Sequence, residues 1–313
     1  MAKRISVINF KGGVGKTTFS FHFAAGLARF HKARVLMVDM DHQSSLSIVS
    51  LTAPEWANTV AANRTVNEIF KPFIEPAPLP DRSIITRHAI KQSGTLPYQN
   101  LDILPASLQL DDIEIELTAS HQGNAVQSEW NKRTLICRWL EEAEVDDEYD
   151  YIIFDCPPAT KLVSQNAIAA SHGFIVPVIP EAVMERGAPH LVGMIANGID
   201  QKLKEYAPLQ QRPRKMYVPD TKLVGLVVTR IQTHGPANSG YLDDHTTHLA
   251  SLQRRWKDDL LTPYIEQGTG ISQSLAANLP VYDRAGTQNV GNRGLHTMYK
   301  ELTDNLKSRV DAL

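Results

Sequence analysis

The segment NFKGGVGKTT, residues 9–18, carries the strongest indication of fold and chemistry in this chain. Its last residues, GKT, match the end of a phosphate-binding loop, for which the usual pattern is G-x-x-x-x-G-K-[ST]. That pattern requires glycine at position 10, but the chain has Phe10 there, and a second lysine, Lys11, follows directly. The segment is therefore a chance glycine cluster, a damaged loop, or a loop built for something additional.

The residues on both sides of this loop favour phosphate binding. ISVINF (5–10) reads as a strand and KTTFSFHFAAGLARF (16–30) as a helix, which is the context that such a loop requires. The glycines between them let several backbone N–H groups point at one anion, and the helix N-terminus adds its positive end. In this arrangement Lys16 reaches the β- and γ-phosphates, and the Thr17 hydroxyl holds Mg²⁺.

Short β-branched runs recur along the chain, and each is followed by a helical pattern. The expected strands are 5–10, 34–41, 101–106, 151–158, 173–180 and 222–229. The expected helices lie near 16–31, 107–118, 130–143, 161–170, 182–200, 243–260 and 292–311. Continuous apolar runs suit strands buried on both faces. The alternation predicts an α/β fold, a doubly wound and mostly parallel sheet with helices on both faces.

We expect a single domain over residues 1–313 with two elaborations. The first is an excursion from the core at about 53–100, with one short helix near 65–70. Four prolines within 72–80 exclude regular structure from that part of it. The second elaboration is a basic loop at about 207–220, directly before the last expected strand.

Carboxylates end two of the expected strands. Asp155 closes YDYIIFD, a position from which a second strand can present a carboxylate to Mg²⁺. Asp39 and Asp41 close VLMVDMD, and residues two apart in an extended chain point the same way. Because ligands of such sheets bind at the carboxyl ends of the strands, we expect all three to face the phosphate site.

Composition and charge narrow the possible functions. The 313 residues are 42% hydrophobic and 21% charged, the two cysteines form no C-x-x-C pair, and no apolar run is long enough to span a bilayer. The net charge of −2 is unevenly distributed, because residues 101–150 hold thirteen acidic and three basic side chains. Basic residues gather in 201–230, so this part either recruits a polyanion or is an ordinary solvated surface.

The motifs together resemble the ParA/MinD family, the deviant-Walker-A group of P-loop ATPases. The resemblance rests on KGGVGKTT (11–18), DMDHQSS (39–45), IIFDCPP (152–158) and the spacing through 174–182. It continues more weakly through 261–283 and covers most of the chain. In this family the first glycine of the usual pattern is not required, which explains the phenylalanine at position 10.

The resemblance implies roles for individual residues. Lys11 matches the signature lysine, which in this family crosses a dimer interface to the partner's nucleotide. Asp41 matches the residue that positions the attacking water. The resemblance therefore implies Lys11, Lys16 and Asp41 as the catalytic candidates. Thr17 is implied to bind Mg²⁺ directly, and Asp39 and Asp155 through water. The candidate ATP-binding residues are Lys11, Gly12, Gly13, Val14, Gly15, Lys16, Thr17, Thr18 and Asp155, with looser matches for the adenine at Thr229, Arg230 and Pro263.

The implied function is an ATPase with slow intrinsic turnover that positions a plasmid, a chromosome or another cargo. Its cofactors are ATP and Mg²⁺, and its partners are a second copy in the ATP state, nonspecific DNA, and a ParB-like or other cargo-linked protein that stimulates hydrolysis. We expect it in the cytoplasm, on the nucleoid in the ATP state, without an N-terminal helix-turn-helix domain. The candidate DNA contacts are Arg212, Arg214, Lys215, Arg254, Arg255 and Lys257.

Two other functions are compatible with the same loop. A MinD-like ATPase that cycles on a membrane needs a basic amphipathic C-terminal helix. The chain ends KSRVDAL, without an aromatic anchor, so membrane binding is not expected. A metabolic kinase or ligase would need a substrate pocket with dedicated acid–base groups, and no such set stands out in the sequence.

Overall fold

The fold is built on one sheet of seven parallel strands in the order β3-β2-β4-β1-β5-β6-β7. The computed structural model describes residues 1–91, 97–158, 160–234, 240–284 and 294–313. The strands are β1 Lys3–Val7, β2 Val35–Asp39, β3 Leu101–Leu104, β4 Tyr151–Asp155, β5 Gly173–Val178, β6 Lys222–Val228 and β7 Leu260–Leu261. The doubly wound α/β fold is thereby confirmed, and six of these strands match expected runs.

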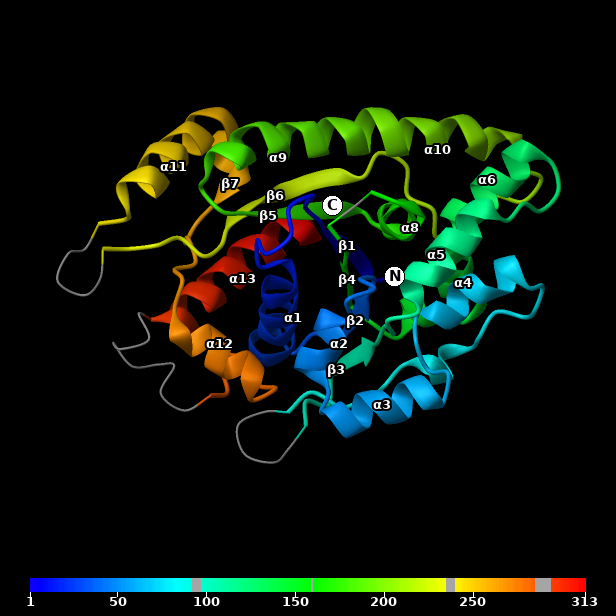
Figure 1. Cartoon of the computed structure of the whole chain (residues 1–313), viewed down its shortest axis with the longest axis horizontal. Helices are drawn as coiled ribbons and strands as arrows, with labels where there is room; N and C mark the ends of the chain where they lie inside the picture. Colours follow the sequence, from blue (N-terminus) through cyan, green and yellow to red (C-terminus); the bar gives the residue numbers. More distant parts are fainter. Residues whose placement is uncertain (92–96, 159, 235–239, 285–293) are drawn as a thin grey trace.

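Helices cover both faces of this sheet (Figure 1). The α-helices are α1 Lys16–His31, α2 Ser45–Ser50, α3 Ala53–Ala61, α4 Asn67–Ile74, α5 Leu110–Ala119, α6 Ala125–Arg133, α7 Leu135–Glu142, α8 Leu162–Ala170, α9 Ala182–Met194, α10 Gln201–Tyr206, α11 Asp243–Trp256, α12 Thr269–Ala276 and α13 Leu295–Asp311. Among the described residues, none of them is both long enough and apolar enough to cross a membrane.

Each face of the sheet has its own apolar core. In β2, Val35 and Met37 belong to the core under α1 and α13, whereas Leu36 and Val38 belong to the core on the opposite face. This split follows from the alternation of side chains along a strand. Because every residue of β2 is buried, the strand reads in the sequence as a continuous apolar run.

The segment between β2 and β3 is more regular than expected. Helix α2 lies before the expected excursion at 53–100, which itself contains α3 in addition to α4, the helix that overlaps the one expected near 65–70. The expectation that prolines exclude regular structure is wrong at Pro72, which lies inside α4. The helix tolerates this residue because Phe70 and Phe73 are buried in the core on both sides of it. The expected excursion therefore contributes to the core; residues 92–96 of it lie outside the described part.

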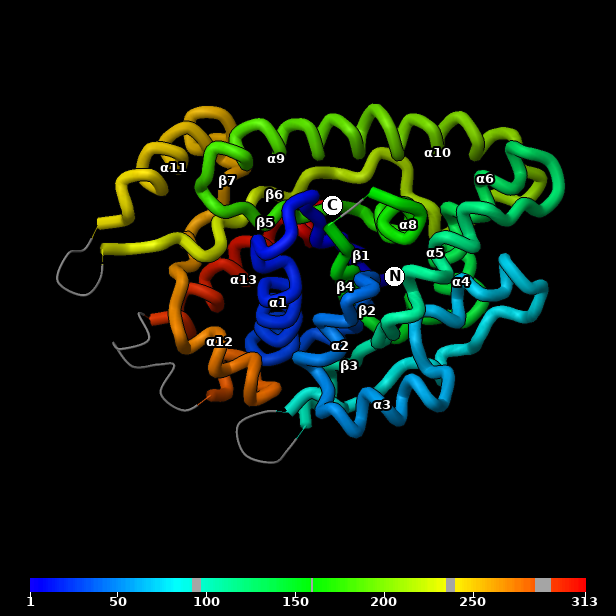
Figure 2. The backbone as a smooth tube through the Cα atoms, in the orientation of Figure 1, coloured from blue at the N-terminus to red at the C-terminus, as the bar shows by residue number. Residues whose placement is uncertain are grey.

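Other differences concern where helices end. The helix expected over 130–143 is divided at Thr134 into α6 and α7, because Asn166 Oδ1 accepts hydrogen bonds from the N–H groups of Leu135 (2.7 Å) and Ile136 (3.2 Å). The helix expected over 182–200 continues through a π-helical turn, Ile195–Asp200, into α10. Figure 2 shows this stretch as one continuous rod. Helix α12 and strand β7 were not expected, and residues 292–293 of the expected last helix lie outside the described part.

His22 in α1 gives the fold a measurable pH dependence. Its ring is fully buried and stacks on Tyr299 at 4.5 Å, and its Nδ1 donates to the Thr18 carbonyl at 2.7 Å. Burial lowers the pKa of His22 to about 4, so the ring stays neutral in the fold while it titrates near 6.5 in the unfolded chain. Its contribution to stability is therefore present above pH 6.5 and is lost as the pH falls toward 4.

We expect wild-type protein to lose about 2 to 3 kcal/mol more stability than His22→Phe between pH 7.5 and 4.5. Urea unfolding at several pH values measures this difference, and the comparison cancels the contributions of all other titrating groups. Parallel curves for the two proteins would show that His22 is not held neutral.

Candidate functional site

The loop between β1 and α1 is held in a conformation that only glycine adopts readily. Gly13 and Gly15 have φ of 75° and 79°. Two residues that follow β6 fix the loop from the other side. Thr229 Oγ1 donates to the Val14 carbonyl, and Arg230 Nη1 donates to the Gly13 carbonyl, both at 2.5 Å. With these carbonyl groups bound on one side, the loop is pre-shaped for an anion at the start of α1.

Lys16 is a buried cation with no close counter-ion among the residues that the structure describes. Its side chain is only 6% exposed, and its Nζ donates to the Lys11 carbonyl at 3.4 Å. Within the described residues it forms no ion pair. Burial lowers the pKa of Lys16, and this is partly offset by the negative charges of Asp155 and Asp41. A phosphate group would supply the missing partner for this ammonium.

Thr17 and Asp155 form the expected pair beside the loop. Thr17 Oγ1 donates to Asp155 Oδ2 at 2.7 Å, and Ser20 Oγ donates to Asp155 Oδ1 at 2.9 Å. β1 and β4 are adjacent, with Val7 opposite Asp155, so the strand pairing delivers the carboxylate to the start of α1. Burial raises the pKa of Asp155 to about 6, although the two hydrogen bonds lower it in part.

This donor set fits Mg²⁺ bound mainly through phosphate and water. Mg²⁺ takes one or two protein oxygens and keeps several waters. The described residues include no group of three or more His, Cys, Asp or Glu side chains that could hold a metal alone. The Thr17 hydroxyl with the Asp155 carboxylate behind it is therefore the arrangement that a phosphate-bound Mg²⁺ requires.

Asp39 and Asp41 differ in what they can reach. Asp41 lines the cavity beside the loop, is 7% exposed, and accepts from the Gln43 N–H at 3.0 Å. Asp39 is fully buried and accepts from the N–H (2.8 Å) and the hydroxyl (2.7 Å) of Ser47. Asp39, the last residue of β2, also accepts from the Asp41 N–H at 3.1 Å, and it is not among the residues that line the cavity. Asp39 supports the loop that presents Asp41.

Lys11 is bound within its own chain. Its Nζ forms an ion pair with Glu181 Oε2, at the residue directly before α9. Asn9 holds the lysine in place, because its Oδ1 accepts from the Lys11 N–H (3.1 Å) and its Nδ2 donates to the Pro177 carbonyl (2.6 Å). Both partners of the ion pair are about one third exposed, so the pair is weak and Lys11 is free to exchange it for another anion.

A cavity of about 720 Å³ opens beside the loop. One wall is polar and includes Gly12, Lys16, Thr17, Thr18 and Asp41; the other is apolar and includes Val49, Ile265, Ile271 and Leu275. Thr229 and Arg230 line it as well, whereas Pro263, which follows a cis peptide bond, is not among the lining residues. A volume of this size accommodates a nucleotide, with phosphates on the polar wall and a base on the apolar wall.

The basic residues proposed as DNA contacts lie in two places. Arg212, Arg214 and Lys215 precede β6, at the edge where the parallel strands begin, which is opposite to the phosphate loop. Arg254 and Arg255 are exposed in the last turn of α11, and the exposed Lys257 follows the helix. α11 packs on α9 through a hydrogen bond of 2.7 Å from His248 Nδ1 to Glu185 Oε1.

Several residues of the site were not predicted from the sequence. Asn9, Ser47 and Glu181 act only through partners far away in the chain, and no local pattern marks them. Ser20 is one helical turn after Thr17, a spacing that could have indicated its contact with Asp155. The apolar wall on α12 was missed together with the helix itself.

Comparison with known proteins places this geometry in a family. A family model described as an AAA domain matches residues 2–206, more than half of the chain. A ParA family protein of Chlamydia trachomatis is 24% identical over 287 residues, which cover 90% of this chain and 91% of the relative. The chain belongs to the ParA-like P-loop ATPases.

Solved structures agree with this family at the level of the fold. A putative plasmid partition protein from Borrelia burgdorferi bound to AMPPNP has a TM-score of 0.65 at 20% identity, over 99% of this chain and 98% of that one. Cobyrinic acid a,c-diamide synthase from Mycobacterium smegmatis, with a bound ATP analogue and magnesium, has a TM-score of 0.64 at 23% identity, over 97% and 93%. The ParA-like fold is therefore shared with an enzyme of metabolism.

Proposed function

We propose that this ParA-like chain is an ATPase that dimerises around ATP and binds DNA nonspecifically in that state. One observation carries the proposal: the phosphate loop contains two lysines, and only the side chain of Lys16 is buried at the loop itself. Lys11 is partly exposed and paired with a replaceable carboxylate. A second cation in this position suits the nucleotide of another copy, where it neutralises charge that develops on the γ-phosphate.

In this proposal the cavity binds Mg-ATP. The backbone of Gly12 to Gly15 and the Lys16 ammonium bind the phosphates, and Thr17 and Thr18 lie beside them. Mg²⁺, when bound, would screen the phosphate charge; Thr17 would hold it directly and Asp155 through water. Asp41, at the rim of the cavity, orients the attacking water, and Asp39 fixes its loop. Adenine lies against the wall of Ile265, Ile271 and Leu275, between Thr229 and α12.

Dimerisation and hydrolysis are then linked through Lys11. For Lys11 to reach the partner's nucleotide it must leave Glu181, the residue directly before α9, and α9 packs against α11. ATP therefore changes the interactions of the α9–α11 unit when the dimer forms. A cargo-linked, ParB-like partner that stimulates hydrolysis would reverse this change. The expected location is the cytoplasm, with the ATP state on the nucleoid.

The α11 cluster (Arg254, Arg255 and Lys257) is the better candidate for the DNA surface. Its three side chains are exposed, and its helix contacts the element that Lys11 must release. The 212–215 cluster is less suited, because Arg214 is partly buried and the cluster precedes β6, at the edge of the sheet opposite to the phosphate loop. With a net charge of −2, the chain depends on such a local patch to bind a polyanion.

The test compares DNA binding by two charge variants, each made in an Asp41→Ala protein so that the ATP state accumulates. Fluorescence anisotropy with a random duplex is measured with Mg-ATP and with Mg-ADP across a salt titration. We expect binding only with ATP, independent of sequence, and an Arg254→Gln/Arg255→Gln variant with a salt slope reduced by about two. Arg212→Gln/Lys215→Gln is the matched control and should bind like the parent.

Two results would contradict ATP-dependent DNA binding, and a third would contradict its assignment to α11. Equal binding with ATP and ADP would separate DNA from the nucleotide cycle. No binding in either state would show that DNA is not a partner, and it would favour an enzyme such as the synthase that shares this fold. A reduced slope in the control pair alone would move the DNA surface to the 212–215 cluster.

A further inference from the structure

A second pocket lies far from the nucleotide cavity, at the edge of the sheet where the strands begin. It has a volume of about 280 Å³ and lies between α6, α7 and the segment before β6. Three arginines line it, Arg138, Arg212 and Arg214, together with one carboxylate, Glu142. Figure 1 shows α6 beside the end of α10, at the end of the molecule opposite to α11 and α12.

Among the described residues that line this pocket, positive charges outnumber negative ones. Glu142 is already paired, because Arg138 Nε donates to its Oε1 at 2.6 Å. Arg214 has a neutral partner, with Nη2 donating to Asn131 Oδ1 at 3.4 Å. Burial lowers the pKa of the Arg214 guanidinium and the neighbouring charge of Arg138 lowers it further, while Glu141 and Glu142 offset part of this shift. The pocket therefore concentrates positive charge where an incoming anion would be the missing partner.

Unpartnered polar atoms gather at the same corner. The described residues contain ten buried side-chain nitrogen or oxygen atoms without a hydrogen-bond partner, and four of them are here: Trp130 Nε1, Gln210 Oε1, Arg214 Nε and Tyr217 Oη. Leaving such a group unsatisfied costs about 1–3 kcal/mol each, so a cluster of them requires an explanation.

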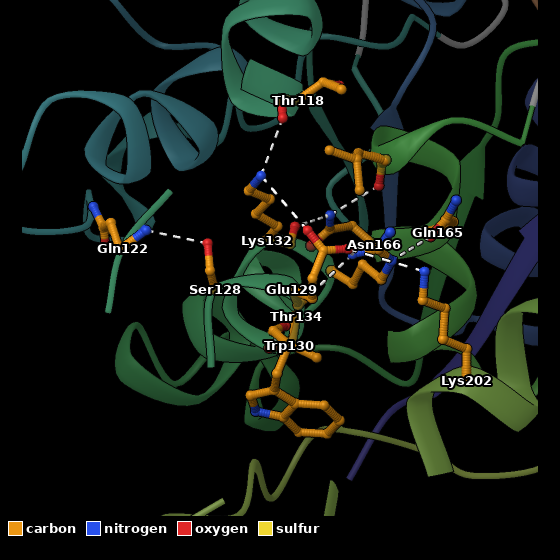
Figure 3. Close-up of polar contacts among 12 residues, drawn as sticks. Thr118, Gln122, Ser128, Glu129, Trp130, Lys132, Thr134, Gln165, Asn166 and Lys202 are labelled. Atoms are coloured by element: carbon orange, nitrogen blue, oxygen red, sulfur yellow. Dashed lines mark hydrogen bonds and ion pairs between the residues drawn. The ribbon is translucent and has the colours of Figure 1, made fainter. Parts of the chain in front are cut away.

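Trp130 connects this cluster to the pocket. It lines the pocket, is only 1% exposed, and packs edge-on against Tyr217 with ring centroids 5.0 Å apart. Figure 3 shows its ring on the opposite side of α6 from Lys132, which donates to the Thr118 carbonyl at 3.1 Å. The polar groups on that side of α6 are paired, whereas the side toward the arginines keeps an indole N–H and an arginine N–H to donate.

We propose that this pocket binds a phosphate group, held by Arg212 and Arg214 with Asn131 and the indole N–H of Trp130 beside it. A pocket of this volume is large for a chloride ion and too small for a whole nucleotide, which suits one phosphate with a small substituent or one backbone phosphate of a polymer. Planar guanidinium groups bind phosphate oxygens in pairs. The site is separate from the nucleotide cavity, because the two lie at opposite edges of a parallel sheet.

The first arm of the test uses inorganic phosphate on the full chain, with the nucleotide cavity filled by a non-hydrolysable ATP analogue and Mg²⁺. Calorimetric titration at constant ionic strength should show one site with a Kd of about 1 mM or below. Arg212→Gln/Arg214→Gln should weaken this binding at least about tenfold, because two charge-assisted contacts are lost. Arg254→Gln/Arg255→Gln is the matched control and should bind phosphate like wild type.

The second arm distinguishes a free phosphate from a phosphate in DNA. If duplex DNA competes with inorganic phosphate for the wild-type protein and not for Arg212→Gln/Arg214→Gln, the occupant is a backbone phosphate. If phosphate binds and DNA does not compete, the occupant is a small phosphorylated molecule. No phosphate binding, or equal binding by wild type and the double variant, overturns the site.

Whether phosphate binds here is independent of the function proposed above; only competition by DNA would add this pocket to the DNA surface proposed at α11. Phosphate binding here requires neither ATP hydrolysis nor a dimer, so the pocket can fail while ATP-dependent DNA binding by α11 holds, and the reverse. The double variant should fold, because Arg214 is a partly buried charge whose removal relieves desolvation. Its unfolding free energy in phosphate-free buffer, equal to or above that of wild type, checks this point.

Discussion

Lys16→Met is expected to weaken ATP binding about 100-fold and to leave the free protein at least as stable as wild type. Lys16 as a residue is 6% exposed, and within the described residues its ammonium group has a carbonyl oxygen at 3.4 Å and no ion pair. Burying it without a counter-ion costs free energy in the absence of ligand. A charge-assisted contact to phosphate returns about 1.5–3 kcal/mol, which is roughly 10- to 100-fold in affinity.

Calorimetric titration with Mg-ATP measures the change in affinity, and urea unfolding without nucleotide measures the stability of the free protein. Methionine keeps most of the buried stem, so a loss of binding reports the charge rather than a cavity. Lys11→Met is the matched control, because Lys11 is partly exposed and pairs with Glu181 away from the loop; it should keep most of the affinity for ATP. Wild-type affinity in Lys16→Met would show that the loop does not bind the phosphates.

The fold was predictable wherever one local signal dominated. The strands of the sheet core are buried on both faces, so their apolar runs are visible in the sequence, and α1 spans Lys16–His31 as expected. The division of α6 from α7 was not predictable, because Asn166, more than thirty residues later, binds the free N–H groups of Leu135 and Ile136. The helix propensity of residues 130–143 gives no information about a capping side chain that belongs to another helix.

In the candidate site too, features contained in one short segment were predictable, and features that depend on distant residues were not. The loop from Gly12 to Thr18 could be predicted because its chemistry is contained in one short segment, and the structure brings Asp41 and Asp155 to it. The different roles of Asp39 and Asp41 were not visible, because they depend on Ser47, which turns back and binds Asp39. Glu181 was missed for a similar reason, because its contact with Lys11 exists only in the folded chain.

Asp41→Ala is expected to lower the rate of ATP hydrolysis by about 10²- to 10⁴-fold with little change in ATP affinity. Asp41 reaches the cavity, and one of its oxygens accepts from the Gln43 N–H at 3.0 Å, which fixes the carboxylate toward the polar wall. A carboxylate at this place can orient a water for attack on the γ-phosphate, but it repels the phosphates themselves. Removing it therefore affects the reaction far more than binding.

Asp39→Asn is the control for this prediction, because it removes a nearby carboxylate that does not line the cavity. Asp39 is fully buried and accepts from Ser47 and from the Asp41 N–H, and its burial beside Asp155 raises its pKa to about 7. Asparagine keeps one acceptor oxygen, which can still accept from the N–H and hydroxyl of Ser47, but its NH2 group cannot accept from the Asp41 N–H. Asp39→Asn should therefore loosen the loop only at that one contact and retain much of the hydrolysis. Single-turnover rates with Mg-ATP for both variants, alongside calorimetric Kd values, measure the difference. Equal losses of rate in the two variants would assign Asp41 to supporting the loop and leave the attacking water to another group.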